Sequence, residues 1–106
     1  MEMENMSLLN WQVENDGKSI YRKFTCKNWQ AAMDCINALS AVAESKDIQH
    51  HPDIHLTKYR DVEIRLWTHA VGGLTMYDLK LAQGINKSVI VDYSKKWLLS
   101  QEQEGK

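Results

Sequence analysis

The chain has 106 residues, of which 43% are hydrophobic and 25% charged, and 13 basic residues nearly balance 14 acidic ones. This composition is typical of one globular domain that buries roughly two-thirds of its unfolded surface. It excludes collagen-like, mucin-like and coiled-coil chains, and it gives no basic field for nucleic acid or anionic membranes. Because no apolar run is long enough to span a bilayer and the acidic N-terminus is unlike a signal peptide, we expect a cytoplasmic protein.

The chain contains no internal repeat, no low-complexity tract and a single proline, Pro52. We therefore predict one domain over residues 1–106, with loose ends at about 1–7 and 100–106. Cys26 and Cys35 are too few for a disulfide framework, so two reduced, partly buried thiols are expected.

The first expected element is a β-hairpin, because apolar and polar residues alternate on both sides of Asn15-Asp16-Gly17-Lys18. An Asp-Gly pair supplies the positive φ angles of a type I′ turn. This turn places Val13 opposite Ile20 and Trp11 opposite Arg22. One face of the hairpin should then carry the apolar side chains that need a cover: Leu9, Trp11, Val13, Ile20 and Phe24.

A long amphipathic helix is expected next, over about residues 28–46. Asn28 is a suitable N-cap residue. Apolar residues recur after it at steps of three or four, as on one face of a helix: Trp29, Met33, Ile36, Leu39, Val42 and Ala43.

Residues 54–59 and 62–69 are predicted to form a second strand pair, joined at Arg60-Asp61 and ended by the Gly72-Gly73 break. One face of the later strand should carry Val62, Ile64 and Leu66, and the other Glu63, Arg65, Trp67 and His69. Arg-Asp is a poor type I′ pair, so the register of this hairpin stays open.

The last expected element is a helix that starts at residue 76 and can run to about residue 99. Thr75 has the position of an N-cap residue, and Asp78 has the N3 position of a capping box. Gly84 and Asn86 are candidate interruptions. The order ββαββα predicts an α+β two-layer sandwich, with helices on one face of a four-stranded antiparallel sheet.

The candidate chemical groups are histidines. Three of the four histidines lie at positions 50, 51 and 55, and the fourth is His69. Pro52 favours extended backbone at His51, which points neighbouring side chains to opposite sides. His50 and His51 can therefore be surface residues of a polar loop, and His69 a half-buried strand residue. Alternatively, His50, His51, His69 and an inward-facing Asp78 meet in one cleft.

Other chemistry has little support in the sequence. The spacing of histidines and cysteines does not fit a zinc site, and we expect no metal and no cofactor. A nucleophile motif, a phosphate loop and a nucleic-acid-binding pattern are also missing. General acid–base catalysis by histidine remains, because an imidazole exchanges protons near neutral pH.

Read together, one set of residues resembles the signature of the pterin-4a-carbinolamine dehydratases: Lys46, His50-His51-Pro52, Tyr59, His69 and Asp78. Residues 50–56 and 67–75 also resemble the plant and protist branch of that family. The resemblance covers about residues 10–87. It implies a domain core over about residues 9–87 and a helical C-terminal extension over 88–100.

The resemblance implies a hydro-lyase that eliminates water from 4a-hydroxytetrahydrobiopterin to give the quinonoid dihydropterin, as in tetrahydrobiopterin recycling. By position, His50, His51 and His69 match the catalytic histidines. His50 is expected to be the base, His69 the acid, and His51 to hold the pterin ring. Substrate-binding or orienting roles are expected for Asp78, Pro52, Tyr59 and Thr68.

The sequence also departs from the family pattern. Many members have a glutamate where Lys46 stands, and the nearest acids here are Glu44 and Asp47, so whether His50 has a carboxylate partner stays open. The resemblance further implies a homodimer or homotetramer, with an aromatic amino acid hydroxylase or a transcription factor as a possible partner. A non-catalytic dimerisation, coactivator or assembly-factor module is the alternative function.

Overall fold

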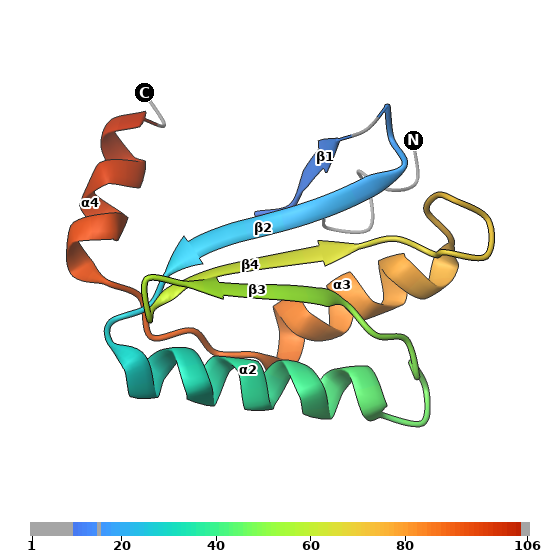
Figure 1. The fold of residues 1–106 in the computed structure, drawn as a ribbon, viewed down its shortest axis with the longest axis horizontal. Coiled ribbons are helices and arrows are strands. Elements are labelled where there is room, and N and C mark those ends of the chain that lie inside the picture. The colour runs from blue at the N-terminus through green and yellow to red at the C-terminus, as the bar shows by residue number, and fades with distance from the viewer. Residues whose placement is uncertain (1–9, 15, 105–106) are drawn as a thin grey trace.

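The computed structural model describes residues 10–14 and 16–104. Its strands are β1 (Gln12–Glu14), β2 (Ser19–Thr25), β3 (Asp53–Thr57) and β4 (Asp61–Leu66), which form one antiparallel sheet in the order β1-β2-β4-β3. Helices α2 (Trp29–Glu44) and α3 (Met76–Ser88) cover one face of the sheet, and α4 (Lys95–Glu104) lies apart from them (Figure 1). The predicted α+β fold is confirmed, with α4 as an added helix.

The first hairpin has the predicted register, since Val13 pairs with Ile20. Asp16 and Gly17 have φ angles of 57° and 86°, as a type I′ turn requires. Val13 was expected under the helices but is exposed, because the short edge strand β1 lies away from α2 (Figure 1). Leu9 and Asn15 lie outside the described residues.

Helix α2 begins as expected, because the Asn28 side chain accepts a hydrogen bond of 2.9 Å from the Ala31 backbone N–H. Trp29 is nevertheless exposed rather than in the core, since it is the first residue of α2, where little of the sheet lies over the helix. The side chains of α2 that face the sheet are small or aliphatic: Ala32, Cys35, Leu39 and Ala43. Cys26 and Cys35 are both free and fully buried.

The core lies between the sheet and the two covering helices. The inward faces of β2, β4, α2 and α3 supply its largest fully buried apolar side chains: Ile20, Leu39, Val62, Ile64, Leu66, Leu81 and Ile85. The predicted inward face of β4 is therefore confirmed.

The second hairpin turns earlier than predicted. Thr57 pairs with Asp61, so residues 58–60 form the connection, and Lys58 and Tyr59 have left-handed φ angles of 49° and 59°. Asp61 belongs to β4, where its carboxylate accepts a hydrogen bond of 2.7 Å from the hydroxyl of Thr25 on the neighbouring strand. The predicted turn at Arg60-Asp61 was wrong.

The prediction of one helix over residues 76–99 is also wrong. The chain leaves α3 after Ser88, whereas Gly84 and Asn86 lie inside this helix. The backbone N–H of Ser94 donates to the Thr25 carbonyl, and that of Lys27 donates to the Asp92 carbonyl, each at 2.9 Å. Because β1 pairs with β2 only as far as Tyr21, the other end of β2 has an open edge, and residues 92–94 pair there instead of continuing the helix.

Residues 100–104, expected as a loose end, continue α4. Within the described residues, the structure contains no helix that is long and apolar enough to cross a membrane.

Candidate active site

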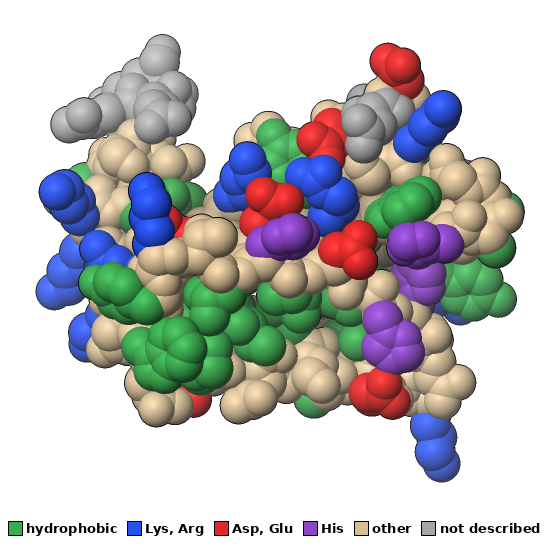
Figure 2. All heavy atoms as spheres, viewed as in Figure 1, with side chains coloured by type: hydrophobic (Ala, Val, Ile, Leu, Met, Phe, Trp, Pro, Cys, Tyr) green, Lys and Arg blue, Asp and Glu red, His purple; other side chains and the backbone are tan. Residues whose placement is uncertain are grey.

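Four segments that are distant in the sequence meet at one end of the molecule. They are the end of α2, the start of β3, the end of β4 and the start of α3, at the right in Figure 1. Histidine side chains gather at the same end (Figure 2). The topology thus brings the segments that carry His50, His69 and Asp78 together.

The closest link in this region joins His50 to Asp78. The Nε2 atom of His50 lies 2.7 Å from the Oδ1 atom of Asp78. The Asp78 side chain is completely buried, whereas 18% of the His50 side chain is exposed. The ring of Tyr77 flanks His50, with 5.9 Å between the ring centroids. His50 is therefore held on one edge by Asp78 and only partly open to solvent.

The second carboxylate oxygen of Asp78 fixes the start of α3. Its Oδ2 atom accepts hydrogen bonds from the Thr75 backbone N–H at 2.9 Å and from the Thr68 hydroxyl at 2.7 Å. The Thr75 side chain completes the predicted capping box. Asp78 therefore has two functions, since one oxygen caps a helix and holds Thr68 while the other holds an imidazole.

The loop after α2 carries His50 to this carboxylate. The His50 backbone N–H donates to the Ala43 carbonyl at 3.2 Å, near the end of α2. Gln49 has a left-handed φ of 42°, which turns the chain back toward α3. Ile48 packs against the core and anchors the loop. The carboxylate partner of His50 is thus Asp78, rather than Glu44 or Asp47.

His51 points elsewhere, as its neighbour Pro52 favours. Its Nε2 atom lies 2.5 Å from Glu44 Oε1, and about two-thirds of each side chain is exposed, 67% for His51 and 68% for Glu44. The adjacent imidazoles of His50 and His51 therefore have different carboxylate partners. Pro52 is half-buried and directly precedes β3.

His69 was predicted to end a strand. In the structure it belongs to a turn that follows β4. The turn is closed by mutual backbone hydrogen bonds between Thr68 and Gly73. The His69 ring lies against the Trp67 ring, with 3.9 Å between centroids. His69 is exposed, and its imidazole makes no hydrogen bond to any side chain that the structure describes.

Trp67 also lines a cavity of about 540 Å³ on the sheet face away from the helices. Its indole N–H donates a hydrogen bond of 3.1 Å to Asp53 Oδ2. The remaining lining residues come from β2, β4 and the two adjoining turns: Asp16, Lys18, Ser19, Arg65 and Gly72. Trp67 therefore connects this cavity to His69, although the lining of the cavity includes no histidine among the described residues.

Tyr59 does not belong to this region. It lies in the β3–β4 turn, at the other end of β3 from Pro52, about 20 Å away at the rise of an extended strand. Within one chain the structure separates Tyr59 from His50 and His69, and its expected role in substrate binding stays a prediction. His55 is exposed on β3.

Trp67 was overlooked as a site residue. Its position on the outward face of β4 was expected, but its stacking on His69 was not. The Trp67-Thr68-His69 order was the available signal, because Trp67 and His69 are two residues apart and fall on one side of an extended chain. Within residues 10–14 and 16–104, no group of three or more His, Cys, Asp or Glu side chains is placed to hold a metal ion.

The arrangement is suited to proton transfer. A carboxylate oxygen accepts hydrogen bonds, so the Nε2 atom of His50 carries the proton in the bond to Asp78, and Nδ1 of the neutral ring is left as a proton acceptor. His69 supplies a second imidazole, without a competing carboxylate among the described residues. The two histidines therefore provide a fixed candidate base and a separate candidate acid.

Comparison with known proteins gives consistent matches. A model of the family described as pterin 4 alpha carbinolamine dehydratase matches residues 2–88. Pterin-4-alpha-carbinolamine dehydratase 2, mitochondrial, of Arabidopsis thaliana is 36% identical over 81% of the chain, and the match spans 46% of that protein. A protein named putative pterin-4-alpha-carbinolamine dehydratase of Aquifex aeolicus is 35% identical, over 83% of this chain and 82% of its own length.

Two solved structures have similar folds. The transcriptional coactivator/pterin dehydratase from Brucella melitensis has a TM-score of 0.69 and 30% identity, over 81% of this chain and 90% of that chain. A pterin dehydratase-like protein identified as a RuBisCO assembly factor in the alpha-carboxysome has a TM-score of 0.58 and 16% identity, over 76% and 89% of the chains. The second likeness concerns the fold alone.

Proposed function

The chain belongs to the pterin 4 alpha carbinolamine dehydratase family, and we propose that it eliminates water from a 4a-hydroxytetrahydropterin to give the quinonoid dihydropterin. Its relatives are named for this type of reaction, and the Arabidopsis protein is longer than the part that matches. Membership and the proton-transfer geometry support the same chemistry. The cytoplasmic location stays a prediction, and the name of the Arabidopsis relative places that protein in mitochondria.

In the proposed reaction, His50 and His69 move two protons. The Nδ1 atom of His50 takes the proton from N5 of the pterin while Asp78 holds the opposite side of the ring. The N5 electron pair forms the C4a=N5 double bond, and the C4a–O bond breaks. His69 protonates the departing hydroxyl, which leaves as water. Exchange with solvent then restores both imidazoles, since an imidazole gains and loses protons near neutral pH.

Binding of the pterin is assigned to the surroundings of the two histidines. The cavity of about 540 Å³ beside Trp67 falls in the size range of small-molecule sites. His51 is exposed at the same end of the molecule and is proposed to hold the pterin ring. Thr68 and Pro52 are proposed to orient the neighbouring histidines, because Thr68 donates to Asp78 and Pro52 limits the backbone of His51.

The buried Asp78 carboxylate bound to His50 is the observation that supports this function best, since a solvated loop histidine needs no such partner. The test is the rate at which 4a-hydroxytetrahydrobiopterin is lost in the presence of the protein. His50→Ala and His69→Ala should each remove roughly 10²–10⁴-fold of the acceleration. His55→Ala, which changes an exposed histidine on β3, is the matched control and should retain it. A wild-type rate equal to that of buffer would contradict the proposal.

A binding module is the second candidate function. The similar protein from Brucella melitensis is named as both a coactivator and a dehydratase, and large apolar side chains such as Trp29 and Tyr59 are exposed here. We propose a homodimer or homotetramer, which light scattering of the purified chain can test. An inactive protein that still binds a hydroxylase or a transcription factor would favour the binding module over the enzyme.

A further inference from the structure

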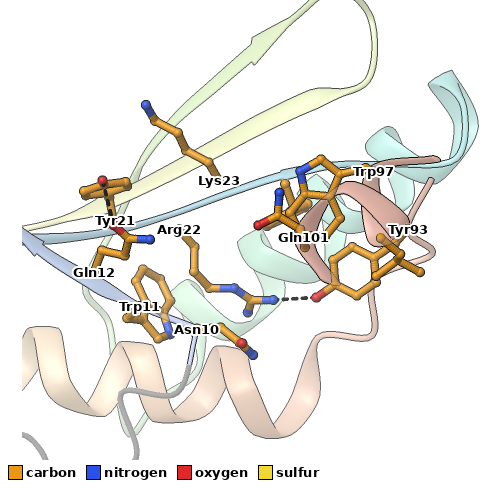
Figure 3. A pocket seen from close by; sticks show the side chains of 11 residues that line it. Asn10, Trp11, Gln12, Tyr21, Arg22, Lys23, Tyr93, Trp97 and Gln101 are labelled. Carbon is orange, nitrogen blue, oxygen red and sulfur yellow. Dashed lines mark hydrogen bonds between the residues drawn. The ribbon is translucent and has the colours of Figure 1, made fainter. Parts of the chain in front are cut away.

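A second cavity lies away from His50 and His69, on the part of the molecule that carries α4. It has a volume of about 830 Å³ and lies between the β1–β2 edge and α4 (Figure 3). Trp11 and Arg22 form one side, and Tyr93, Trp97 and Gln101 form the other. Tyr93 and α4 follow residue 88, where the family match ends. This cavity is therefore built partly from a segment that the dehydratase family does not account for.

Arg22 is the unusual residue of this cavity, because it is only 7% exposed. Its Nη2 atom donates a hydrogen bond of 2.7 Å to the Tyr93 hydroxyl, and Nη1 donates one of 3.5 Å to Asn86 Oδ1. The guanidinium also lies 5.9 Å from the Trp11 ring centroid and 5.2 Å from that of Phe24. Every one of these partners is uncharged.

Arg22 makes no ion pair with a side chain that the structure describes. A guanidinium stays charged in proteins, so burial without a counter-charge is costly, and cation–π contacts offset only part of that cost. The group has five N–H donors and uses two of them in the bonds to Tyr93 and Asn86. It therefore retains both charge and donors for a bound oxyanion.

The charges around the cavity favour an anion. Its described lining residues include Arg22 and Lys23 and no carboxylate. Lys23 lies 3.7 Å from Glu63, so its charge is already paired, whereas Arg22 has no acidic partner among the described side chains. The remaining lining is rich in aromatic rings, and the Tyr93 and Trp97 rings stack with 5.3 Å between centroids. A flat ring with an anionic group matches both features.

We propose that this cavity is a second ligand site, which binds a small planar aromatic carboxylate. The carboxylate pairs with the Arg22 fork, a geometry that guanidinium and carboxylate groups share. The aromatic ring of the ligand packs beside Trp11 and Trp97. The site requires Tyr93 and α4, and it is independent of His50, His51 and His69 at the other end of the molecule.

The test uses indole-3-acetate as the probe and nuclear magnetic resonance of the full ¹⁵N-labelled chain. Of the four tryptophan indole N–H signals, those of Trp11 and Trp97 should shift, and those of Trp29 and Trp67 should stay. The uncharged indole-3-acetamide should bind at least roughly tenfold more weakly, because it lacks the charge that pairs with Arg22. Inorganic phosphate, which has charge but no ring, should also bind more weakly.

Two variants separate the contributions of charge and ring. Arg22→Lys keeps the positive charge but loses the fork, and should weaken indole-3-acetate binding roughly tenfold. Trp97→Ala removes a cavity wall on α4 and should weaken binding similarly even if Arg22→Lys does not fold. Trp29→Ala, at an exposed position on α2, is the matched control and should bind as the wild type does.

Three results would overturn the proposal. If indole-3-acetate and indole-3-acetamide bind with equal affinity, Arg22 does not recognise the charge of the ligand. If phosphate binds as tightly as indole-3-acetate, the aromatic rings do not contribute to binding. Shifts at Trp67 instead of Trp11 and Trp97, or no shifts up to about 10 mM probe, would show that this cavity is not a site for the class.

Discussion

His50 and Asp78, which are 28 positions apart in the sequence, are joined by a hydrogen bond of 2.7 Å between Nε2 and Oδ1. The same carboxylate caps α3 through its other oxygen. The position of the candidate base therefore depends on the start of α3. This link gives the first prediction, because its two functions can be separated by mutation.

Asp78→Asn should slow dehydration by roughly 100-fold or more, because an amide can donate to Nε2 and favour the wrong imidazole tautomer. Thr75→Ala, the matched change, weakens the cap but leaves the Asp78–His50 bond. It should lower the free energy of unfolding by about 1 kcal/mol with little effect on kcat. Steady-state kinetics and urea unfolding of both variants check this. Equal losses of kcat would mean that Asp78 acts only through the helix.

The exposed pair of His51 and Glu44 is predicted to affect binding rather than stability. Solvent screens this pair, since about two-thirds of each side chain is exposed, so either truncation should change the free energy of unfolding by less than about 1 kcal/mol. His51→Ala should raise KM for the pterin at nearly constant kcat, and Glu44→Gln should do so to a smaller extent. A large fall in kcat for His51→Ala would instead make His51 part of the proton transfer.

Gly84 is predicted to be required for the contact between α2 and α3. A Cβ atom there would lie 2.8 Å from Ile48 Cδ1 and 2.9 Å from Val42 Cγ1. Overpacking costs about 1–3 kcal/mol, which exceeds the gain of about 1 kcal/mol in helix propensity from Gly84→Ala. The variant should therefore be less stable. Gly73→Ala, where nothing lies within 4 Å, is the control in thermal unfolding and should be neutral or slightly stabilising.

The buried thiols predict a loss of stability at alkaline pH. Burial raises the pKa of the Cys35 thiol from 9.0 to about 12, with Cys26 adding to the effect and Arg22 opposing it. The unfolded chain releases this proton near pH 9, whereas the folded chain retains it. The contribution of Cys35 to stability is thus complete below pH 9 and is lost progressively between pH 9 and about 12.

Urea unfolding at increasing pH measures this effect. The Cys35→Ala variant serves as the reference, because other groups that titrate in this pH range contribute to both proteins. The difference in unfolding free energy between the wild type and the variant should shrink above pH 9. A difference that stays constant to the highest pH at which both proteins fold would contradict the raised pKa of Cys35.

Local signals predicted much of the fold. Asn28 and Thr75 were identified as helix caps, and the Asp16-Gly17 turn determined the register of the first hairpin. The break between α3 and α4 was missed, because Val89, Tyr93 and Trp97 keep the spacing of a helix. The open edge of β2 takes up residues 92–94, and competition of this kind depends on tertiary structure.

The candidate site was predicted less completely. The inward direction of the Asp78 side chain was predicted from its helical spacing. The different directions of the His50 and His51 side chains were predicted from the extended backbone that Pro52 favours. The choice of Asp78 as the partner of His50 depends on how α2 and α3 pack, which spacing along the chain does not encode. The distance of Tyr59 from the histidines was not foreseen for a related reason, since β3 places its two ends on opposite sides of the molecule.

The most direct test is a double-mutant cycle on the dehydration rate with His50→Ala, Asp78→Asn and the pair. If the two residues act as one unit, the double variant should be about as slow as His50→Ala alone, because the second change removes nothing further. Fully multiplicative losses, or a His50→Ala variant with the wild-type rate, would contradict the assignment of His50 and Asp78 as a catalytic pair.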